Sequence, residues 1–200
     1  QDSDRMCRNN THCRQIIRKP FEGKPTGADS GNGAADSDKR PLREGRATAE
    51  LELNLITGQL RPTLGTVRVL NESPCNNANL YRRLGYCPGG EGLYANVSGY
   101  DWVVYLQQLQ GMTSTRARTA ARDSLELVGM SEAMYRPISS YSRGMRQRTK
   151  LAQAIAHDPE FLILDEPFNG LDPVGRHELT KVLLDWIDLG KSLLFPRSIQ

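Results

Sequence analysis

A run of four apolar residues that leads directly into two carboxylates constrains the fold of this chain more than any other feature. Residues 161–164 read FLIL, and Asp165 and Glu166 follow at once. Such a run is typical of a strand buried on both faces of a parallel sheet. Open α/β sheets bind ligands at the carboxyl ends of their strands, so we expect both carboxylates at a ligand-binding edge. There Asp165 would suit a Mg²⁺ ion and Glu166 could orient or deprotonate an attacking water, although paired carboxylates also occur as purely structural charges.

Amphipathic segments precede and follow this strand. Ser142 stands at the start of the first, where a serine is a favourable N-cap, and Gly144 leaves the backbone of the first turn accessible. The N–H groups and positive dipole end of such a helix bind phosphate. Residues 169–173, NGLDP, are typical of a turn. A second amphipathic helix is expected after it, with one face made of Leu179, Val182, Leu183, Trp186 and Ile187. The predicted order is phosphate-binding helix, buried strand, acidic pair, turn and helix.

These segments resemble three motifs of the ATP-binding subunits of ABC transporters. The family's L-S-G-G-Q signature stands here as residues 141–145, YSRGM, and its Walker B strand stands as residues 161–166, FLILDE. Its D-loop stands as residues 169–172, NGLD, and the order and spacing of the three motifs match without gaps. The form YSRGM, followed by Arg146 and Gln147, is most similar to the subunits that drive ABC-2 type exporters.

The resemblance implies roles for individual residues. They are Glu166 as the catalytic carboxylate, Asp165 as the Mg²⁺ ligand, Ser142, Arg143, Gly144 and Met145 as contacts to the nucleotide of a partner subunit, and Asn169, Gly170, Leu171 and Asp172 as the D-loop. In the family, two subunits bind two ATP molecules head to tail, and hydrolysis with Mg²⁺ drives transport through membrane-spanning permease subunits. The expected location is therefore cytoplasmic, peripheral on the inner face of a membrane through those permeases.

The fold implied by the resemblance is α/β: a partial P-loop NTPase-like core with a mostly parallel sheet and a helical signature subdomain. The partial ATP-binding domain would cover residues 47–200, with the helical subdomain at about residues 89–145 and the permease-docking surface near residues 89–109. Residues 54–70 resemble the stretch that follows the phosphate loop. There Gly58 ends a short helix, and Val67 and Val69 alternate as in a half-buried strand.

Three motifs of the family are missing or altered. The P-loop string G-x-x-x-x-G-K-[ST], whose backbone and lysine hold the phosphates, occurs nowhere in the sequence. The ungapped register places Ala49 at the lysine position and Glu50 at the position of the Mg²⁺-binding hydroxyl. The Q-loop glutamine is Gly89 here, and no histidine follows the strand-like residues 192–195, where the family has its switch histidine. The match thus stops beside an essential motif at both ends, and we expect an ATPase core whose ends have been lost or replaced.

Two hypotheses about function follow. The first is an ATP-hydrolysing subunit of an ABC transporter. The second is a catalytically impaired subunit or fragment, which lacks the Walker A lysine and supplies only the signature half-site to an intact partner. The absence of that lysine favours the second hypothesis over self-sufficient hydrolysis. A third class, the ABC proteins of translation or DNA repair, is disfavoured by the form YSRGM and by a single ATPase unit without a coiled-coil insertion.

Composition agrees with a cytosolic globular protein outside the first 46 residues. Residues 1–46 mix glycines and scattered charges with few large apolar residues, so we expect them to be disordered or unrelated to the family. The net charge of +3 is too small to indicate nucleic acid as a partner. The four cysteines form no C-x-x-C pair, which favours reduced thiols and no zinc site. The sequence contains no secretory signal and no apolar run long enough to span a membrane.

Overall fold

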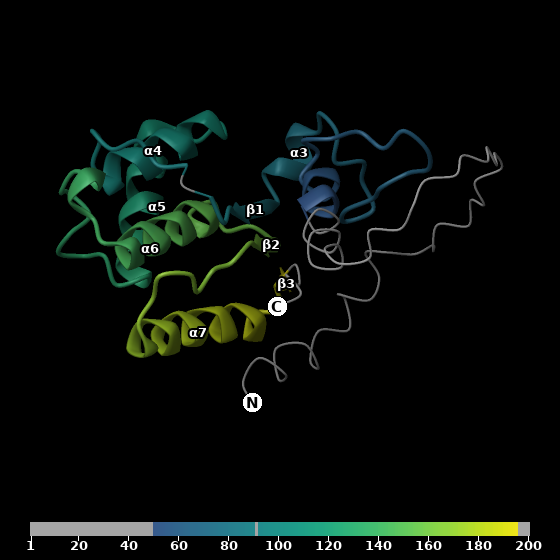
Figure 1. Ribbon diagram of the computed structural model, residues 1–200. Coiled ribbons are helices and arrows are strands. Elements are labelled where there is room, and N and C mark those ends of the chain that lie inside the picture. The colour runs from purple at the N-terminus through teal and green to yellow at the C-terminus, as the bar shows by residue number, and fades with distance from the viewer. Residues whose placement is uncertain (1–49, 91, 196–200) are drawn as a thin grey trace, which may run out of the picture.

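The computed structural model describes residues 50–90 and 92–195 (Figure 1). Residues 50–56 are helical, and the named elements follow in chain order. These are α3 (Ala78–Tyr81), β1 (Leu84–Cys87), α4 (Gly99–Leu109), α5 (Ser114–Leu127), the 3₁₀ helix η1 (Ile138–Ser140), α6 (Arg143–Ile155), β2 (Phe161–Leu164), α7 (Pro173–Asp188) and β3 (Ser192–Leu194). The expectations for residues 1–46 and for Ala49 lie outside the described residues. Within them, every helix is too short or too polar to cross a bilayer.

The strands form a parallel sheet in the order β1-β2-β3, with β2 in the centre. Leu84 of β1 pairs with Phe161 of β2, which in turn pairs with Ser192 of β3. All four residues of β2 are buried, as expected for an apolar run of this kind. The prediction of a buried parallel strand at residues 161–164, and with it the α/β class, is confirmed.

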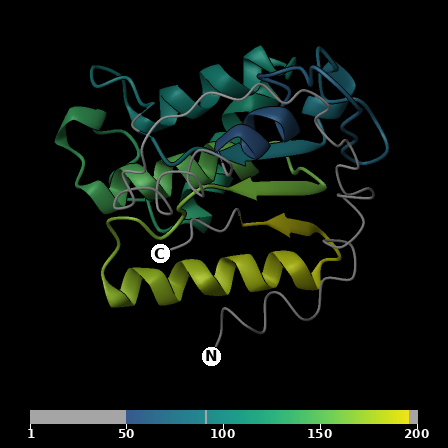
Figure 2. The same cartoon turned by 45° about the vertical axis from the view of Figure 1, so that its right-hand side comes forward.

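Two hydrophobic cores lie on opposite faces of this sheet, because successive side chains of a strand point in opposite directions. Leu162 and Leu164 pack into the larger core, which α4, α5, α6 and α7 build with their apolar faces. Phe161 and Ile163 pack into the smaller core, built from the segment 53–84. In Figure 1 the strands accordingly separate α4–α7 on the left from α3 and the helical residues 50–56 on the right, and Figure 2 shows α7 running alongside the strands.

Each long helix begins at a side-chain cap that the sequence supplies. Ser98 and Thr113 accept hydrogen bonds from the backbone N–H groups of Asp101 and Arg116 at the starts of α4 and α5. These caps fix the residues at which α4 and α5 begin. The two helices pack against each other and against α6.

The strand expected at Val67 and Val69 is wrong. Val69 is fully buried, but among the described residues its backbone forms only an isolated antiparallel bridge with Glu72. A half-buried alternating segment becomes a strand only where a neighbouring strand is available to pair with it. Here the chain turns back at once, because Leu70 and Asn71 adopt positive φ angles of 49° and 65°.

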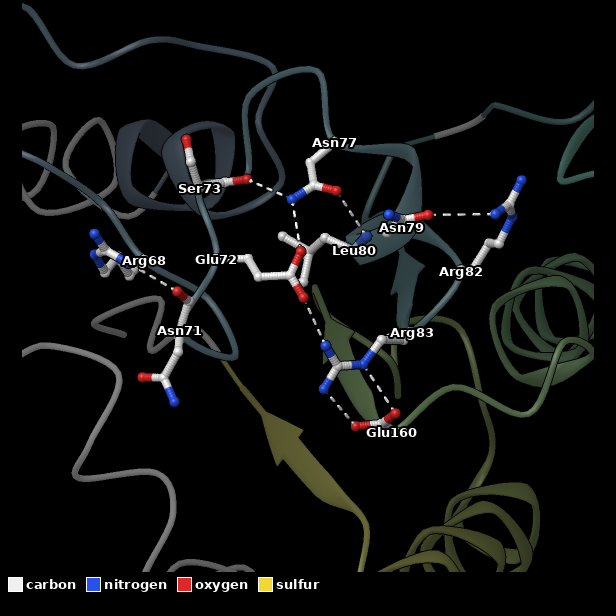
Figure 3. Close-up of polar contacts among 10 residues, drawn as sticks. All are labelled: Arg68, Asn71, Glu72, Ser73, Asn77, Asn79, Leu80, Arg82, Arg83 and Glu160. Atoms are coloured by element: carbon white, nitrogen blue, oxygen red, sulfur yellow. Dashed lines mark hydrogen bonds and ion pairs between the residues drawn. The ribbon is translucent and has the colours of Figure 1, made fainter.

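A polar network ties this turn to the start of β2 (Figure 3). The guanidinium of Arg83 donates to Glu72 at 2.7 Å and to both carboxylate oxygens of Glu160 at 2.9 and 2.8 Å. Asn77 donates to the second oxygen of Glu72 at 2.8 Å, and its own side-chain oxygen caps α3. Because Arg83 lies directly before β1 and Glu160 directly before β2, the network fixes the amino ends of both strands, opposite the edge that carries Asp165 and Glu166.

Candidate functional site

Asp165 and Glu166 lie at the carboxyl edge of the sheet, as predicted. The backbone N–H of Asp165 donates to the carbonyl of Cys87 at 2.9 Å, which extends the pairing of β1 and β2 by one residue. Its carboxylate Oδ2 accepts the backbone N–H of Gly89 at 3.2 Å. Both acidic side chains are partly exposed, so each is fixed by the sheet and still accessible to a ligand.

The electrostatics of this edge favour a cation. Burial raises the pKa of Asp165 above its ordinary value, and the charges of Glu166 and Glu50 raise it further. The hydrogen bond from Gly89 and the charge of Lys150 act in the opposite direction. Glu50, predicted to stand at a metal-binding position, is thus close enough to influence Asp165, and a bound cation would relieve the repulsion among the carboxylates.

The donor chemistry of this edge fits Mg²⁺ with a nucleotide better than it fits a metal held by protein alone. Within the described part of the chain, no cluster of three or more His, Cys, Asp or Glu side chains is arranged to hold a metal ion. Mg²⁺ is usually held by one or two carboxylates together with substrate phosphates and water, so a complete protein cage is not required.

The signature segment begins α6 and remains accessible. Ser142 is exposed, and its Oγ accepts the backbone N–H of Met145 at 3.2 Å, so it is the N-cap that the sequence predicted. Gly144 packs against the D-loop: a Cβ at this position would lie 3.3 Å from the carbonyl oxygen of Gly170 and 3.3 Å from Leu171 Cδ2. The first turn of α6 and the D-loop are therefore in direct contact.

The D-loop side chains connect the acidic pair to α6 and α7. Asn169 Nδ2 donates to Glu166 Oε2 at 3.0 Å, and Asn169 Oδ1 accepts from Arg143 Nη2 at 2.8 Å. Asp172 Oδ1 accepts the backbone N–H of Gly175 at 3.1 Å and so caps α7. The structure thus brings together the predicted residues of all three motifs along one edge of the molecule.

Two residues of this site were missed by the sequence analysis. Lys150 is only 6% exposed, and its ammonium donates to the carbonyls of Pro88, Gly89 and Gly90 at 3.0, 3.4 and 3.1 Å. Gln147 is also buried, and its Nε2 donates to the backbone oxygen of Glu166 at 3.4 Å. A lysine on the buried face of an amphipathic helix was the available signal, because such a charge needs several acceptors.

Gly89, at the predicted Q-loop position, leaves room for the carboxylate beside it. A Cβ on Gly89 would lie 2.8 Å from Asp165 Oδ2. Gly89 also borders a cavity of about 250 Å³, whose lining includes Arg143, Arg146, Gln147 and Lys150 of α6. The position at which the switch histidine would be expected, residues 196–200, lies outside the described residues.

Comparison with known proteins agrees with the motifs. The profile of the family described as "ABC transporter" matches residues 51–169. The chain is 37% identical over 131 residues to the uncharacterized ABC transporter ATP-binding protein YxlF of Bacillus subtilis. The aligned residues make up 66% of this chain and 43% of YxlF. It is 41% identical over 123 residues to the bacitracin transport ATP-binding protein BcrA of Enterococcus faecalis, covering 61% of this chain and 39% of BcrA.

A third relative is the ergothioneine transport ATP-binding protein EgtV of Helicobacter pylori, 33% identical over 132 residues, which are 66% of this chain and 62% of EgtV. The chain matches less than half the length of YxlF and BcrA. The family profile nevertheless covers more than half of the chain, including the signature and Walker B residues and the first D-loop residue, Asn169. This chain therefore belongs to the ATP-binding subunits of ABC transporters.

Proposed function

We propose that this chain binds and hydrolyses ATP in an ABC transporter and couples hydrolysis to transport across a membrane. The main observation in support is that Asp165 and Glu166 lie at the carboxyl edge of a parallel sheet, beside the N-terminus of α6 and the D-loop. Side chains of this kind at this edge suit nucleotide phosphates and the attack of water on them. The family membership supports the same assignment.

The proposed roles follow from the contacts. Bound Mg²⁺ would supply positive charge to the phosphate oxygens, and Asp165 would hold it. Glu166 would orient the attacking water and accept its proton, with its carboxylate held by Asn169. Ser142, Arg143, Gly144 and Met145 would serve the nucleotide of a second ATP-binding subunit, because they begin a helix whose N-terminal end suits phosphate, and Ser142 and Arg143 are exposed there.

The proposed partners are permease subunits and a second ATP-binding subunit. Large side chains of the helical region are exposed: Tyr105 is 63% and Leu109 is 80% exposed on α4, and Tyr94 is 70% exposed just before it. Exposed apolar and aromatic residues of this kind suit a protein partner. We place the permease contact there, within a helical subdomain at about residues 89–145 of an ATP-binding domain that spans residues 47–200. Membrane association at the cytoplasmic face would come through the permease, and an ABC-2 type exporter is the proposed subfamily.

Binding of MgATP to the full chain tests the proposal. We expect binding and slow hydrolysis, and a Glu166→Gln variant should keep binding while hydrolysis falls by roughly a hundredfold or more, because the proton acceptor is lost. Glu132→Gln, at an exposed residue, is the matched control and should leave both unchanged. Hydrolysis that is equally fast in Glu166→Gln would refute the role of Glu166.

The same measurement distinguishes the half-site hypothesis. Glu50 stands where the family has a hydroxyl, and its charge acts on Asp165, which opposes phosphate binding in this chain's own site. If the chain alone does not bind MgATP, but restores hydrolysis when mixed with a relative that carries an intact P-loop and an altered signature, the chain supplies the signature half-site only. Loss of that restoration in Ser142→Ala would confirm that the signature residues are responsible.

A further inference from the structure

Arg143 occupies a signature position at which the family has glycine, and its side chain crosses the D-loop. Its aliphatic stem covers Gly170: a Cβ on Gly170 would lie 2.4 Å from Arg143 Cγ and 2.6 Å from Arg143 Cδ. Gly170 also has a φ of +76°, so a side chain there is excluded by both backbone conformation and space. The D-loop glycine thus makes room for the arginine stem, which delivers the guanidinium to Asn169 at 2.8 Å.

This contact determines which way the Asn169 amide faces. A guanidinium can only donate hydrogen bonds, so it must meet the Oδ1 atom of the amide. The Nδ2 atom then faces the opposite way and donates to Glu166 Oε2 at 3.0 Å. A carboxylate can only accept hydrogen bonds when ionised, so a flipped amide would set oxygen against oxygen at Glu166 and nitrogen against nitrogen at Arg143. The three side chains are therefore mutually ordered.

The backbone of Glu166 is held as well. Glu166 has a φ of +48°, a left-handed conformation that is unusual for a residue with a side chain. Its carbonyl oxygen accepts from Gln147 Nε2 at 3.4 Å and from the backbone N–H of Asn169 at 3.1 Å. The contacts from α6 and the D-loop thus bear on both the main chain and the carboxylate of Glu166.

We propose that Arg143 is a positioning residue for Glu166 and acts through the Asn169 amide. The inference deepens the proposed function, on which its kinetic part rests. It also gives Arg143 a role within its own subunit, in addition to the contact with a partner's nucleotide that the signature motif implies. Because Arg143 is exposed, the contact contributes little to global stability, and the test must therefore report the position of the amide rather than unfolding.

The test uses the full chain labelled with ¹⁵N and needs no nucleotide. The side-chain amide signals of Asn169 are assigned by their loss in Asn169→Ala. In Arg143→Met, which keeps a stem over Gly170 but removes the donor, we expect these signals to shift and their protons to exchange at least tenfold faster with solvent. In Arg143→Lys the new ammonium can still donate to Asn169 Oδ1 and accepts no hydrogen bond, so most of the protection from exchange should return. Arg118→Met, at an exposed arginine of α5, is the control and should leave the Asn169 signals unchanged.

Kinetics supply the second measurement. Misplacement of Glu166 should lower kcat roughly tenfold in Arg143→Met, and a rise in KM would report the separate contact of Arg143 with a partner's nucleotide. Because Arg143 acts through Asn169, adding Arg143→Met to Asn169→Ala should cause no further loss of kcat. Unchanged Asn169 signals in Arg143→Met would overturn the inference, and so would a raised KM with kcat intact, which would assign Arg143 to nucleotide binding alone. If the chain does not hydrolyse ATP, the proposed catalytic function fails, and the amide signals still decide whether Arg143 orders Asn169.

Discussion

Gly85 in the middle of β1 sets how closely α6 approaches the sheet, and Gly85→Ala should disrupt this packing. A Cβ on Gly85 would lie 2.3 Å from the backbone oxygen of Ala154 in α6, 2.7 Å from Leu162 Cδ1 and 2.8 Å from Pro159 Cγ. The nearest obstacle is main chain, which cannot rotate away as the end of a flexible side chain can. The helix and the strand would have to separate locally before a methyl group could fit.

The cost follows from this geometry. Overpacking a close-packed interior typically costs about 1–3 kcal/mol, and the upper end applies because a helix backbone must move. With about 2–4 °C per kcal/mol for a protein of this size, a loss of about 3 kcal/mol lowers the Tm by roughly 6–12 °C. The same movement would displace α6, with Ser142 and Gly144 at its start, relative to Gly89 and Asp165.

Thermal and urea unfolding of the wild type, Gly85→Ala and Gly90→Ala measure the effect. Gly90 is the matched control, because a Cβ there would have no heavy atom within 4 Å. We expect Gly90→Ala to change the free energy of unfolding by less than about 0.5 kcal/mol. If Gly85→Ala is as stable as Gly90→Ala, the close approach of β1 and α6 does not limit the packing and the argument is refuted.

Three further predictions concern buried or crowded groups. Burial raises the pKa of the Cys87 thiol to about 12. Iodoacetamide at about pH 8 should therefore label the partly exposed Cys75 and spare Cys87 in the folded chain. Peptide mass spectrometry measures the labelling, and equal labelling of the two cysteines would contradict the prediction. Burial lowers the pKa of His157, so the unfolded chain takes up a proton first on acidification. The free energy of unfolding should therefore fall as the pH drops below about 6.5, and His157→Gln should flatten this slope in urea titrations at several pH values. Gly89→Gln, which restores the family's residue, should displace the carboxylate of Asp165, because the new Cβ would lie 2.8 Å from Oδ2. We expect the free energy of unfolding, measured by urea unfolding, to fall by about 1.5 kcal/mol. An unchanged free energy would show that the carboxylate moves freely.

Local signals were sufficient for most of the secondary structure around the site. The apolar run 161–164 with its two carboxylates predicted β2 and the site at its end, and Ser142 predicted the start of α6. Each of these inferences depends on residues within one strand or one helical turn, where side-chain periodicity and capping act directly. The strand expected at Val67 and Val69 did not form, because a strand also needs a pairing partner, which the local pattern cannot specify.

The amino-acid sequence by itself determined the family, the α/β class and the residues at the carboxyl edge of the sheet. Only the tertiary structure decided how those residues are connected. Arg143 and Asn169 are 26 positions apart, and the Lys150 ammonium meets the carbonyl of Pro88 62 positions away. Contacts of this kind depend on the depth at which α6 packs on the sheet, which the close approach at Gly85 sets. Hydrogen bonds between distant segments depend on how whole elements pack, and the residue pattern of a single element does not predict them.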